Sequence, residues 1–368
     1  MSSRAWTKRA IRIIDADFNR SGDTHLVPLR LPAHPGIQLY FKDESSHPTG
    51  SLKHRLARSL FLYALANGWI SEGTTIVEAS SGSTAISEAY FARLLDLPFI
   101  AAMPKSTSPE KIERIAFYGG QSHLVNDAIQ VVAESIALAA AGRGHFMDQF
   151  TYAERATDWR GNNNIAESLF LQMREEPAPE PRYIVCAAGT GGTSATLGRY
   201  VRYRRHDTEV VVADPDNSVL YDYYVSGDPT LTLNTGSLIE GIGRPRVEKS
   251  FLRRAVDSMV KVPDHCSLAA LQYLESALGR RVGGSTGTIF YGALPLIQRM
   301  AEGGERGSLV LILCDGGERY GHSYYSRDWL AAHGFDTVHE RARITDFLER
   351  GEAQDWPVSQ HELTCSIN

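Results

Sequence analysis

Short β-branched runs alternate with longer helical patterns along most of this chain. The runs typical of buried strands lie at 74–77, 99–102, 183–186, 210–213 and 309–313. Helical periodicity predicts helices over 53–67, 83–95, 109–118, 128–141, 164–174, 194–204, 268–278 and 289–300. This alternation predicts an α/β fold of the doubly wound class, with parallel sheets and helices on both faces.

The chain is too long for a single hydrophobic core. Its 368 residues exceed the length at which chains usually divide, so two domains are expected. The Pro-rich segment 175–181 lies inside a helix-to-strand step and is not a boundary. The pattern loosens after Gly334, and the remaining residues are expected to pack as an appendage.

Composition excludes several classes of function. The net charge of -5 and the scattered Lys and Arg residues leave no basic patch for nucleic acid. No apolar run reaches the ~18 residues of a membrane span, and the N-terminus lacks the apolar segment of a signal peptide, so a cytoplasmic protein is expected. The four cysteines form no C-x-x-C pair, which argues against both a disulfide framework and a metal site.

A glycine-rich loop follows the strand at 183–186. It consists of Gly189, Thr190, Gly191, Gly192 and Thr193, and it leads into a helix. Glycines let backbone N–H groups close on an oxyanion at a helix N-terminus, so this loop suits a phosphate. The alternative is a tight strand-to-helix turn without a ligand. The spacing matches neither G-x-x-x-x-G-K-[ST] nor G-x-G-x-x-G, which disfavours ATP and NAD.

A hydroxyl-rich loop follows the strand at 74–77. Ser80, Ser81, Gly82, Ser83 and Thr84 offer hydroxyl and N–H groups that suit a carboxylate. Serine is also a preferred helix N-cap, which would account for one or two of the hydroxyls. Four hydroxyls in five positions exceed what a cap needs, so an anion site is predicted.

Lys53 lies at the start of the predicted helix 53–67, in the segment Pro-Thr-Gly-Ser-Leu-Lys. It could be a solvated surface lysine. Positive charge at a helix N-terminus is unfavourable, however, and His54 and Arg55 add to it. The same field favours the neutral amine that a nucleophile toward an aldehyde cofactor needs. Two further glycine loops, 240–243 and 283–288, are equally consistent with simple turns.

From about Leu26 to Asp328, the order of these motifs resembles the fold type II family of pyridoxal-phosphate enzymes, the cysteine synthase and cystathionine β-synthase group. The resemblance implies a pyridoxal 5'-phosphate cofactor, a homodimer and two doubly wound domains similar to the tryptophan synthase β-subunit, with the active site between them. The smaller domain is expected at 49–153, the larger at 1–48 and 154–334, and the appendage at 335–368.

The resemblance also implies residue roles. Lys53 corresponds to the lysine that forms the internal aldimine, and 189–193 to the phosphate cup. Ser285 corresponds to the serine that faces the pyridine nitrogen, and Ser83 replaces an asparagine that contacts the cofactor. The expected substrate-binding residues are Ser80, Ser81, Gly82, Thr84, Gln149 and Gly241.

Two segments, 241–246 and 314–320, look most like the L-cysteine desulfhydrase branch. Arg244 stands where cystathionine synthases usually carry an aromatic residue, which argues against homocysteine as a substrate. A neutral serine behind the ring makes a weak electron sink, which favours β-elimination or β-replacement over transamination. The expected reaction converts L-cysteine to hydrogen sulfide, pyruvate and ammonia through an aminoacrylate, with Lys53 as general base. The alternatives are cysteine synthesis from O-acetylserine and sulfide, a related β-replacement, and a catalytically inactive ligand-binding sensor.

Overall fold

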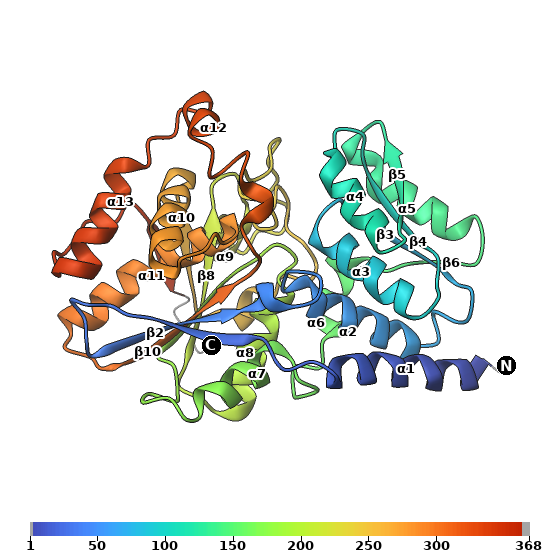
Figure 1. Cartoon of the computed structure of the whole chain (residues 1–368), viewed down its shortest axis with the longest axis horizontal. Helices are drawn as coiled ribbons and strands as arrows, with labels where there is room; N and C mark the ends of the chain where they lie inside the picture. The colour runs from blue at the N-terminus through green and yellow to red at the C-terminus, as the bar shows by residue number, and fades with distance from the viewer. Residues whose placement is uncertain (1–2, 363–368) are drawn as a thin grey trace. The chain divides into compact units, whose positions relative to one another are not determined.

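The computed structural model describes residues 3–362 and divides the chain into two compact units. Unit 1 comprises Met1–Asp23 and His47–Asp158, and unit 2 comprises Thr24–Ser46 and Trp159–Asn368. Each unit contains one sheet whose central strands are parallel, which confirms the predicted α/β class. Figure 1 labels the elements used below.

Unit 1 has a four-stranded parallel sheet of order β5-β4-β3-β6. Its strands are β3 (Thr75–Ala79), β4 (Phe99–Pro104), β5 (Gln121–Val125) and β6 (Gly144–Phe146). Its helices are α1 (Ser3–Asn19), α2 (Lys53–Ala66), α3 (Ser83–Leu94), α4 (Pro109–Phe117), the 3-10 turn η2 (Ala128–Gln130), α5 (Val131–Ala140) and α6 (Gln149–Ala156).

Side chains of unit 1 alternate between two apolar layers, as the pleat of a strand requires. Ile76 and Phe99 pack in the layer that contains α2 and α3. Ala79 and Ala102 pack in a separate layer with Val131 of α5. The sheet is therefore covered on both faces, and Glu78, two residues after Ile76, points to the α3 side.

Unit 2 has a seven-stranded sheet of order β1-β2-β10-β7-β8-β9-β11, antiparallel only where the edge strands β1 and β11 join it. Its strands are β1 (His25–Leu29), β2 (Ile37–Asp43), β7 (Tyr183–Ala187), β8 (Glu209–Pro215), β9 (Ser258–Val262), β10 (Gly307–Leu313) and β11 (Ser359–Glu362).

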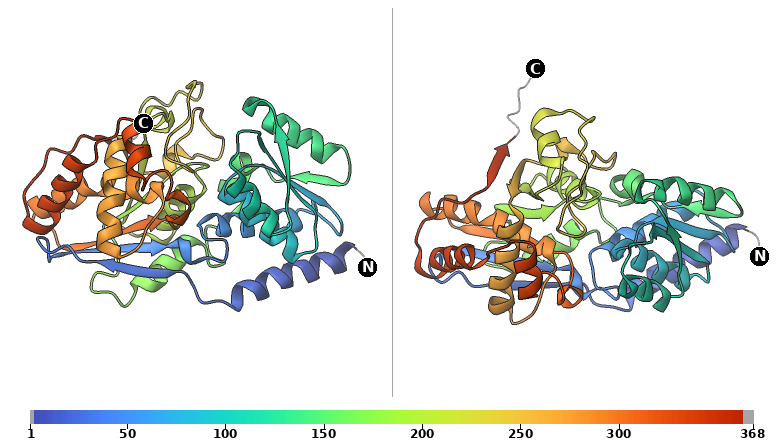
Figure 2. Two further views of the ribbon diagram at one scale, coloured as in Figure 1. Left: turned by 45° about the horizontal axis from the view of Figure 1, so that its top comes forward. Right: turned by 90° about the horizontal axis from the view of Figure 1, so that it is seen from above.

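Helices cover both faces of this sheet, with α10 and α11 on one face and α7 and α8 on the other (Figure 2). The helices are α7 (Ile165–Met173), α8 (Gly192–Arg204), α9 (Leu220–Ser226), α10 (Asp264–Leu278), α11 (Gly284–Glu302), α12 (Arg327–Ala332) and α13 (Val338–Thr345). Shorter turns are η1 (Glu44–Ser46), η3 (Arg253–Ala255), η4 (Glu318–Tyr320) and the π-helical turn Asp346–Arg350.

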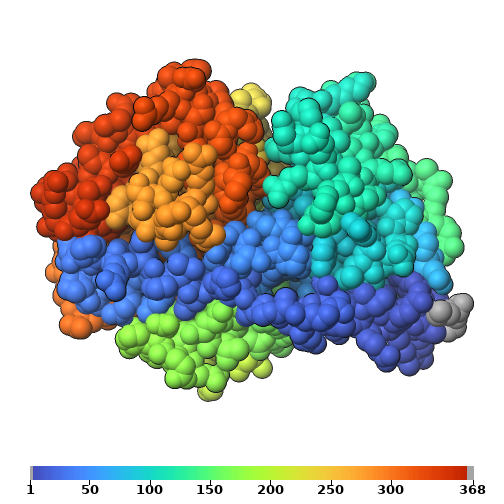
Figure 3. All heavy atoms as spheres, viewed as in Figure 1, coloured from blue at the N-terminus to red at the C-terminus, as the bar shows by residue number. Residues whose placement is uncertain are grey.

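The unit boundaries differ from the predicted ones at the N-terminus. Residues up to Asp23 pack with unit 1, whereas the sequence assigned 1–48 to the larger domain. The physical reason is the apolar stripe Trp6, Ala10 and Ile14 on α1, which is buried in the same core as α2 and α3. Figure 3 shows α1, in dark blue, on the surface of unit 1.

The segment after Gly334 packs on unit 2. The Tyr291 hydroxyl of α11 donates a hydrogen bond of 2.5 Å to Glu340 of α13, and the Trp356 indole donates one of 2.9 Å to Gln298. Trp356 is buried, and β11 extends the sheet beside β9. Residues 363–368 lie outside the described part of the chain.

None of the helices described between residues 3 and 362 is long and apolar enough to cross a bilayer. Among the same residues, no group of three or more His, Cys, Asp and Glu side chains is arranged to hold a metal ion.

Candidate functional site

Lys53 is the first residue of α2, as the sequence predicts, and its side chain is half-buried. The turn before it is held by its own side chains: Ser51 Oγ accepts the Lys53 N–H at 3.3 Å. Thr49 Oγ1 lies 3.2 Å from His54 Nδ1 and 2.9 Å from Ser87 Oγ of α3. Gly50 has φ +75°, a conformation that a residue with a side chain adopts only with strain. These contacts fix the direction in which α2 presents its N-terminal lysine.

The hydroxyl-rich loop joins β3 to α3. The N-cap of α3 is Gly82, and no side chain caps the helix, so serine capping does not explain the hydroxyls here. Ser80 Oγ accepts the Gly82 N–H at 3.2 Å, which closes a tight turn. Ser81 and Ser83 are partly exposed, with Ser83 as the first helical residue. The loop therefore presents hydroxyl groups and a helix N-terminus together, a combination suited to an anion.

Thr84 connects this loop to Gln149. Its hydroxyl donates a hydrogen bond of 2.8 Å to Gln149 Oε1, and both residues are buried. Gln149 begins α6, directly after Asp148, which adopts the left-handed conformation at φ +50°. The side-chain carbonyl of Gln149 is thus engaged by Thr84, which orients the amide group. The structure brings together two of the predicted substrate-binding segments.

In unit 2, the glycine loop joins β7 to α8 as predicted, although α8 begins at Gly192, two residues before the predicted start. Glycine is required at two positions of the loop. A Cβ on Gly189 would collide with the carbonyl oxygen of Gly241, and one on Gly191, which has φ +84°, would lie 2.6 Å from Phe251 Cα. The first N–H groups of α8 have no acceptor within the helix, as at any helix N-terminus. The loop thus exposes backbone donors at a helix N-terminus, and residues 189–193 are called the glycine cradle below.

The loop around Gly241 packs against this cradle. The Gly243 N–H donates to the Ala188 carbonyl at 2.9 Å, and Gly241 itself has φ +87°. Tyr324 holds the other side of the loop: its hydroxyl accepts the Glu240 N–H at 2.9 Å and donates to the Leu238 carbonyl at 2.8 Å. The glycine pair is therefore more than a simple turn, since it closes the side of the cradle.

Ser285 lies in the first turn of α11 and is buried. The helix begins at Gly284, whereas the sequence predicted a loop up to residue 288. The difference arises because Gly287 lets α11 approach α10 closely, with no room for a Cβ against the Ser267 carbonyl. A helix N-terminus replaces the expected loop around the serine.

A charged cluster lies beside this turn. The Gly283 N–H donates to the Asp315 carbonyl at 3.0 Å, and the Asp315 carboxylate accepts from Arg319 and from the Tyr320 hydroxyl, the latter at 2.9 Å. Burial raises the pKa of Asp315, and the Arg319 guanidinium acts against this shift. Tyr320 stacks on Tyr324 with ring centroids 4.9 Å apart. The segment 314–320 thus anchors both the Ser285 turn and the Tyr324 ring.

The predicted site residues fall into two groups. Lys53, the loop 80–84 and Gln149 belong to unit 1, whereas the loop 189–193, Gly241 and Ser285 belong to unit 2. Within each group the segments are joined by the contacts given above.

The sequence prediction missed the residues that hold these loops. Two fully buried carboxyl groups, Glu78 on β3 and Glu88 on α3, lie beneath the hydroxyl-rich loop, and Tyr324 supports the Gly241 loop. Glu78 could have been found, since a charged residue in the apolar run Ile76 to Ala79 is unusual for a buried strand. Nothing in the local sequence marks Tyr324.

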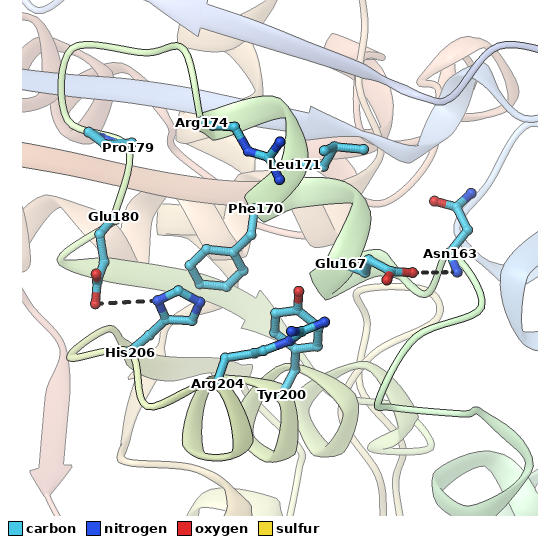
Figure 4. Close-up of a pocket in the computed structure, with 10 residues that line it drawn as sticks. All are labelled: Asn163, Glu167, Phe170, Leu171, Arg174, Pro179, Glu180, Tyr200, Arg204 and His206. Atoms are coloured by element: carbon cyan, nitrogen blue, oxygen red, sulfur yellow. Dashed lines mark hydrogen bonds and ion pairs between the residues drawn. The ribbon is translucent and has the colours of Figure 1, made fainter.

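A surface hollow of about 530 Å³ in unit 2 contains none of these residues. It lies between α7 and α8, where Phe170 stacks on His206 with centroids 4.1 Å apart and His206 contacts Glu180 (Figure 4). Tyr200 and Arg204 place it at the C-terminal end of α8, whereas the glycine loop is at the N-terminal end.

Comparison with known proteins places the sequence and the fold among known families. The sequence profile described as "pyridoxal-phosphate dependent enzyme" matches residues 18–315. The chain is 57% identical over 349 residues to the L-cysteine desulfhydrase Cds1 of Mycobacterium tuberculosis, covering 94% of this chain and 95% of that protein. It is 27% identical to a cysteine synthase of Dictyostelium discoideum, covering 85% of each chain.

Solved structures give the same fold. A crystal structure of O-ureido-L-serine synthase matches with a TM-score of 0.71 and 27% identity, covering 87% of this chain and 98% of that one. A hydrogen sulfide-producing enzyme from Fusobacterium nucleatum matches with a TM-score of 0.72 and 23% identity, covering 84% of this chain and 97% of that one.

Proposed function

The chain belongs to the family of pyridoxal-phosphate-dependent enzymes, and we propose that it converts L-cysteine and water to hydrogen sulfide, pyruvate and ammonia. The observation that carries this proposal is the 57% identity to an L-cysteine desulfhydrase over 94% of the chain. The cysteine synthases are more distant, at 27% identity or below among the examples compared.

The residues of the predicted cofactor site fit pyridoxal phosphate. The cradle at 189–193 excludes side chains at Gly189 and Gly191 and offers backbone donors at the N-terminus of α8, as a phosphate requires. Ser285 is a neutral hydroxyl on a buried turn, suited to an uncharged pyridine nitrogen. Lys53 offers an amine at the start of a helix. We propose that these residues hold the cofactor, and that Ser83 lies close to it.

Bound in this way, the cofactor supplies the electron sink for negative charge that develops at the substrate Cα. We propose that Lys53 Nζ removes the Cα proton, because an amine at a positive helix terminus is favoured in its neutral, basic form. The proton then remains on Nζ, from which it can be returned to a departing or product atom.

Substrate orientation is assigned to the remaining loops of the site. Ser80, Ser81 and Thr84, with the Gly82 turn, are proposed to hold the substrate carboxylate, while Gln149 and Gly241 border the substrate. Fixing the carboxylate determines which Cα substituent faces Lys53. Orientation of this kind accounts for a large part of the rate in many enzymes.

Cysteine synthesis is the second candidate, because it uses the same proton transfer and differs in the group that enters at Cβ. One preparation should be assayed in parallel for sulfide and pyruvate release from L-cysteine and for sulfide consumption with O-acetylserine. Sulfide release should dominate. Much faster consumption with O-acetylserine would assign the protein to synthesis, and a preparation that never gains visible absorbance with cofactor would favour a non-catalytic sensor.

We further propose that the enzyme acts in the cytoplasm as a homodimer on a small amino-acid substrate, without a nucleic-acid or membrane partner. Light scattering coupled to size-exclusion chromatography tests the homodimer: a mass near twice 40.6 kDa is expected, and a mass near 40.6 kDa would contradict it.

A further inference from the structure

A buried carboxyl group connects the two parts of the proposed substrate site in unit 1. Glu78 precedes the hydroxyl-rich loop, and its carboxyl group accepts the Ala79 N–H at 2.7 Å and the Gln149 N–H at 3.3 Å. Gln149 in turn accepts the Thr84 hydroxyl. One side chain therefore fastens both the start of the loop and the start of α6.

Glu88 is the neighbour of Glu78. It lies one helical turn beyond Thr84 on α3, its exposed fraction is 0%, and no hydrogen-bond donor of the described residues reaches either of its carboxyl oxygens. The group that acts on it is the Glu78 carboxyl. Two buried carboxylates in contact repel and are not solvated, so one of the two must carry a proton.

The contacts indicate which residue carries the charge. Glu78 receives two backbone N–H donors, which stabilise a carboxylate, whereas Glu88 receives none. A proton on Glu88 gives it the donor that it otherwise lacks and supplies Glu78 with a third hydrogen bond. This state replaces the repulsion between two carboxylates with a hydrogen bond, and it pairs one of the two Glu88 oxygens that otherwise have no partner.

We propose that Glu78 and Glu88 share one proton and act as a positioning pair, in which Glu88 donates to Glu78 and Glu78 holds the loop and Gln149 in register for the substrate. This proposal rests on the proposed function, because it takes Ser80 to Thr84 and Gln149 as the substrate site.

The pair has a consequence for pH dependence. Burial raises the pKa of Glu78 to about 7, with a smaller contribution from the negative charge of Asp148 before α6. Burial and the neighbouring Glu78 raise the pKa of Glu88 well above its usual range. As the pH falls through about 7, Glu78 gains a proton and becomes a weaker acceptor for the Ala79 and Gln149 N–H groups. The KM for the substrate should therefore rise on the acid side.

Glutamine substitutions separate the two roles. Glu78→Gln removes the charge and can place an amide NH2 group against backbone N–H donors. The KM for L-cysteine should therefore rise about tenfold or more, with a smaller change in kcat. The rise of KM as the pH falls through about 7, called the acid limb below, should vanish in this variant. Glu88→Gln keeps an N–H donor toward Glu78, so its KM should rise much less and the limb should remain. Glu113→Gln, on the exposed part of α4, is the matched control.

Glu88→Leu provides a second variant in case Glu78→Gln fails to fold. It removes the donor without leaving a buried polar group, so the acid limb should move to higher pH. Equal KM values in Glu78→Gln and Glu88→Gln, or an acid limb that stays in place in Glu88→Leu, would assign the pair a purely structural role and overturn the proposal.

Infrared spectra of the unaltered protein and of Glu88→Gln, compared as a difference, report the protonation of Glu88 independently of activity. At pH 8 the protein should show the carbonyl band of a protonated carboxyl group, and Glu88→Gln should lack it. Absence of this band from the unaltered protein would overturn the shared proton whatever the reaction is. A protein that shows the band but releases no sulfide from L-cysteine would instead refute the proposed function.

Discussion

The Thr84 hydroxyl, in the first turn of α3, donates a hydrogen bond of 2.8 Å to the side-chain carbonyl of Gln149 at the start of α6. The two residues are far apart in sequence, and both are buried. The bond links two loops that follow different strands of one sheet, which is how parallel sheets assemble a site at the carboxyl ends of their strands.

Replacing Thr84 with Val should weaken substrate binding. The substitution keeps the shape but leaves the buried Gln149 carbonyl without its donor, at a cost of about 1–3 kcal/mol. We expect a several-fold higher KM for L-cysteine and a lower melting temperature. Thr84→Ser keeps the hydroxyl and should restore most of the affinity; an equal KM in both variants would show that the hydrogen bond does not orient Gln149 for binding.

Lys53→Ala should abolish sulfide release while the fold survives. The side chain is half-buried at the helix start, so its removal leaves no large cavity, but the proposed base and cofactor anchor are lost. Activity should fall by at least about 10³-fold, and the visible absorbance of bound cofactor should change. Lys105→Ala, on an exposed position of the same unit, should retain full activity. Unchanged turnover in Lys53→Ala would refute the assigned role.

Introducing a side chain at Gly189 or Gly191 of the glycine cradle should reduce the affinity for the cofactor. Gly191→Ala places a Cβ against Phe251 at a residue with φ +84°, and Gly189→Ala forces the Gly241 loop away. Fluorescence titration with pyridoxal phosphate should give a dissociation constant raised at least about tenfold in each variant. Gly236→Ala, where a Cβ meets nothing within 4 Å, is the control. Cofactor affinity in Gly189→Ala and Gly191→Ala equal to that of the Gly236→Ala control would show that residues 189–193 do not bind the cofactor.

Tyr324→Phe should loosen the Gly241 loop. The change removes the hydroxyl that accepts the Glu240 N–H and donates to the Leu238 carbonyl, while the ring that stacks on Tyr320 remains. We expect a KM for L-cysteine raised severalfold and faster amide hydrogen exchange confined to the loop. Exchange rates identical to those of the unaltered protein would contradict the supporting role.

Asp214→Asn tests how the folding stability of the protein depends on pH through one buried carboxyl group of unit 2. Burial raises the pKa of Asp214 to about 7, despite hydrogen bonds from Ser218 and the Tyr221 N–H. A raised carboxyl pKa means that the native state binds the proton more tightly than the unfolded state, so this contribution to stability is complete below pH ~4 and is lost as the pH rises through about 7.

Asn cannot ionise, and the variant therefore escapes that loss. Calorimetric melting temperatures at pH 5 and pH 8 should show Asp214→Asn gaining stability relative to the unaltered protein at the higher pH. An offset that is the same at both values would mean that Asp214 does not titrate in this interval.

The strands of the two sheets could be predicted where apolar residues run without interruption. The segments around Ile76, Ile184 and Leu311 form β3, β7 and β10, as expected. Strand β2 was missed because its apolar run is short: Gln38 precedes it and the charged Lys42 ends it. Lys42 is fully buried, and its Nζ donates to the Thr24 carbonyl at 3.0 Å and to Gln172 Oε1 at 2.6 Å. Those partners are distant in sequence, so no local pattern could reveal them.

The candidate site shows the same division. Its loops could be predicted, because Lys53, Ser80 and Gly191 follow from turn chemistry and helix termini, which are local. The groups that hold the loops, Glu78 with Glu88 and Tyr324, act through contacts between separate elements. Their roles depend on burial and on partners that only the folded chain brings together.

The position of β2 between β1 and β10 has a consequence for biosynthesis. β1 and β2 form a hairpin near the N-terminus, but the parallel partner of β2 begins only at Gly307. During synthesis on the ribosome, the edge of β2 that faces away from β1 therefore stays unpaired until unit 1 and most of unit 2 have been made. An unpaired strand edge is a template for aggregation, so chains that terminate before Gly307 should be insoluble and dependent on chaperones.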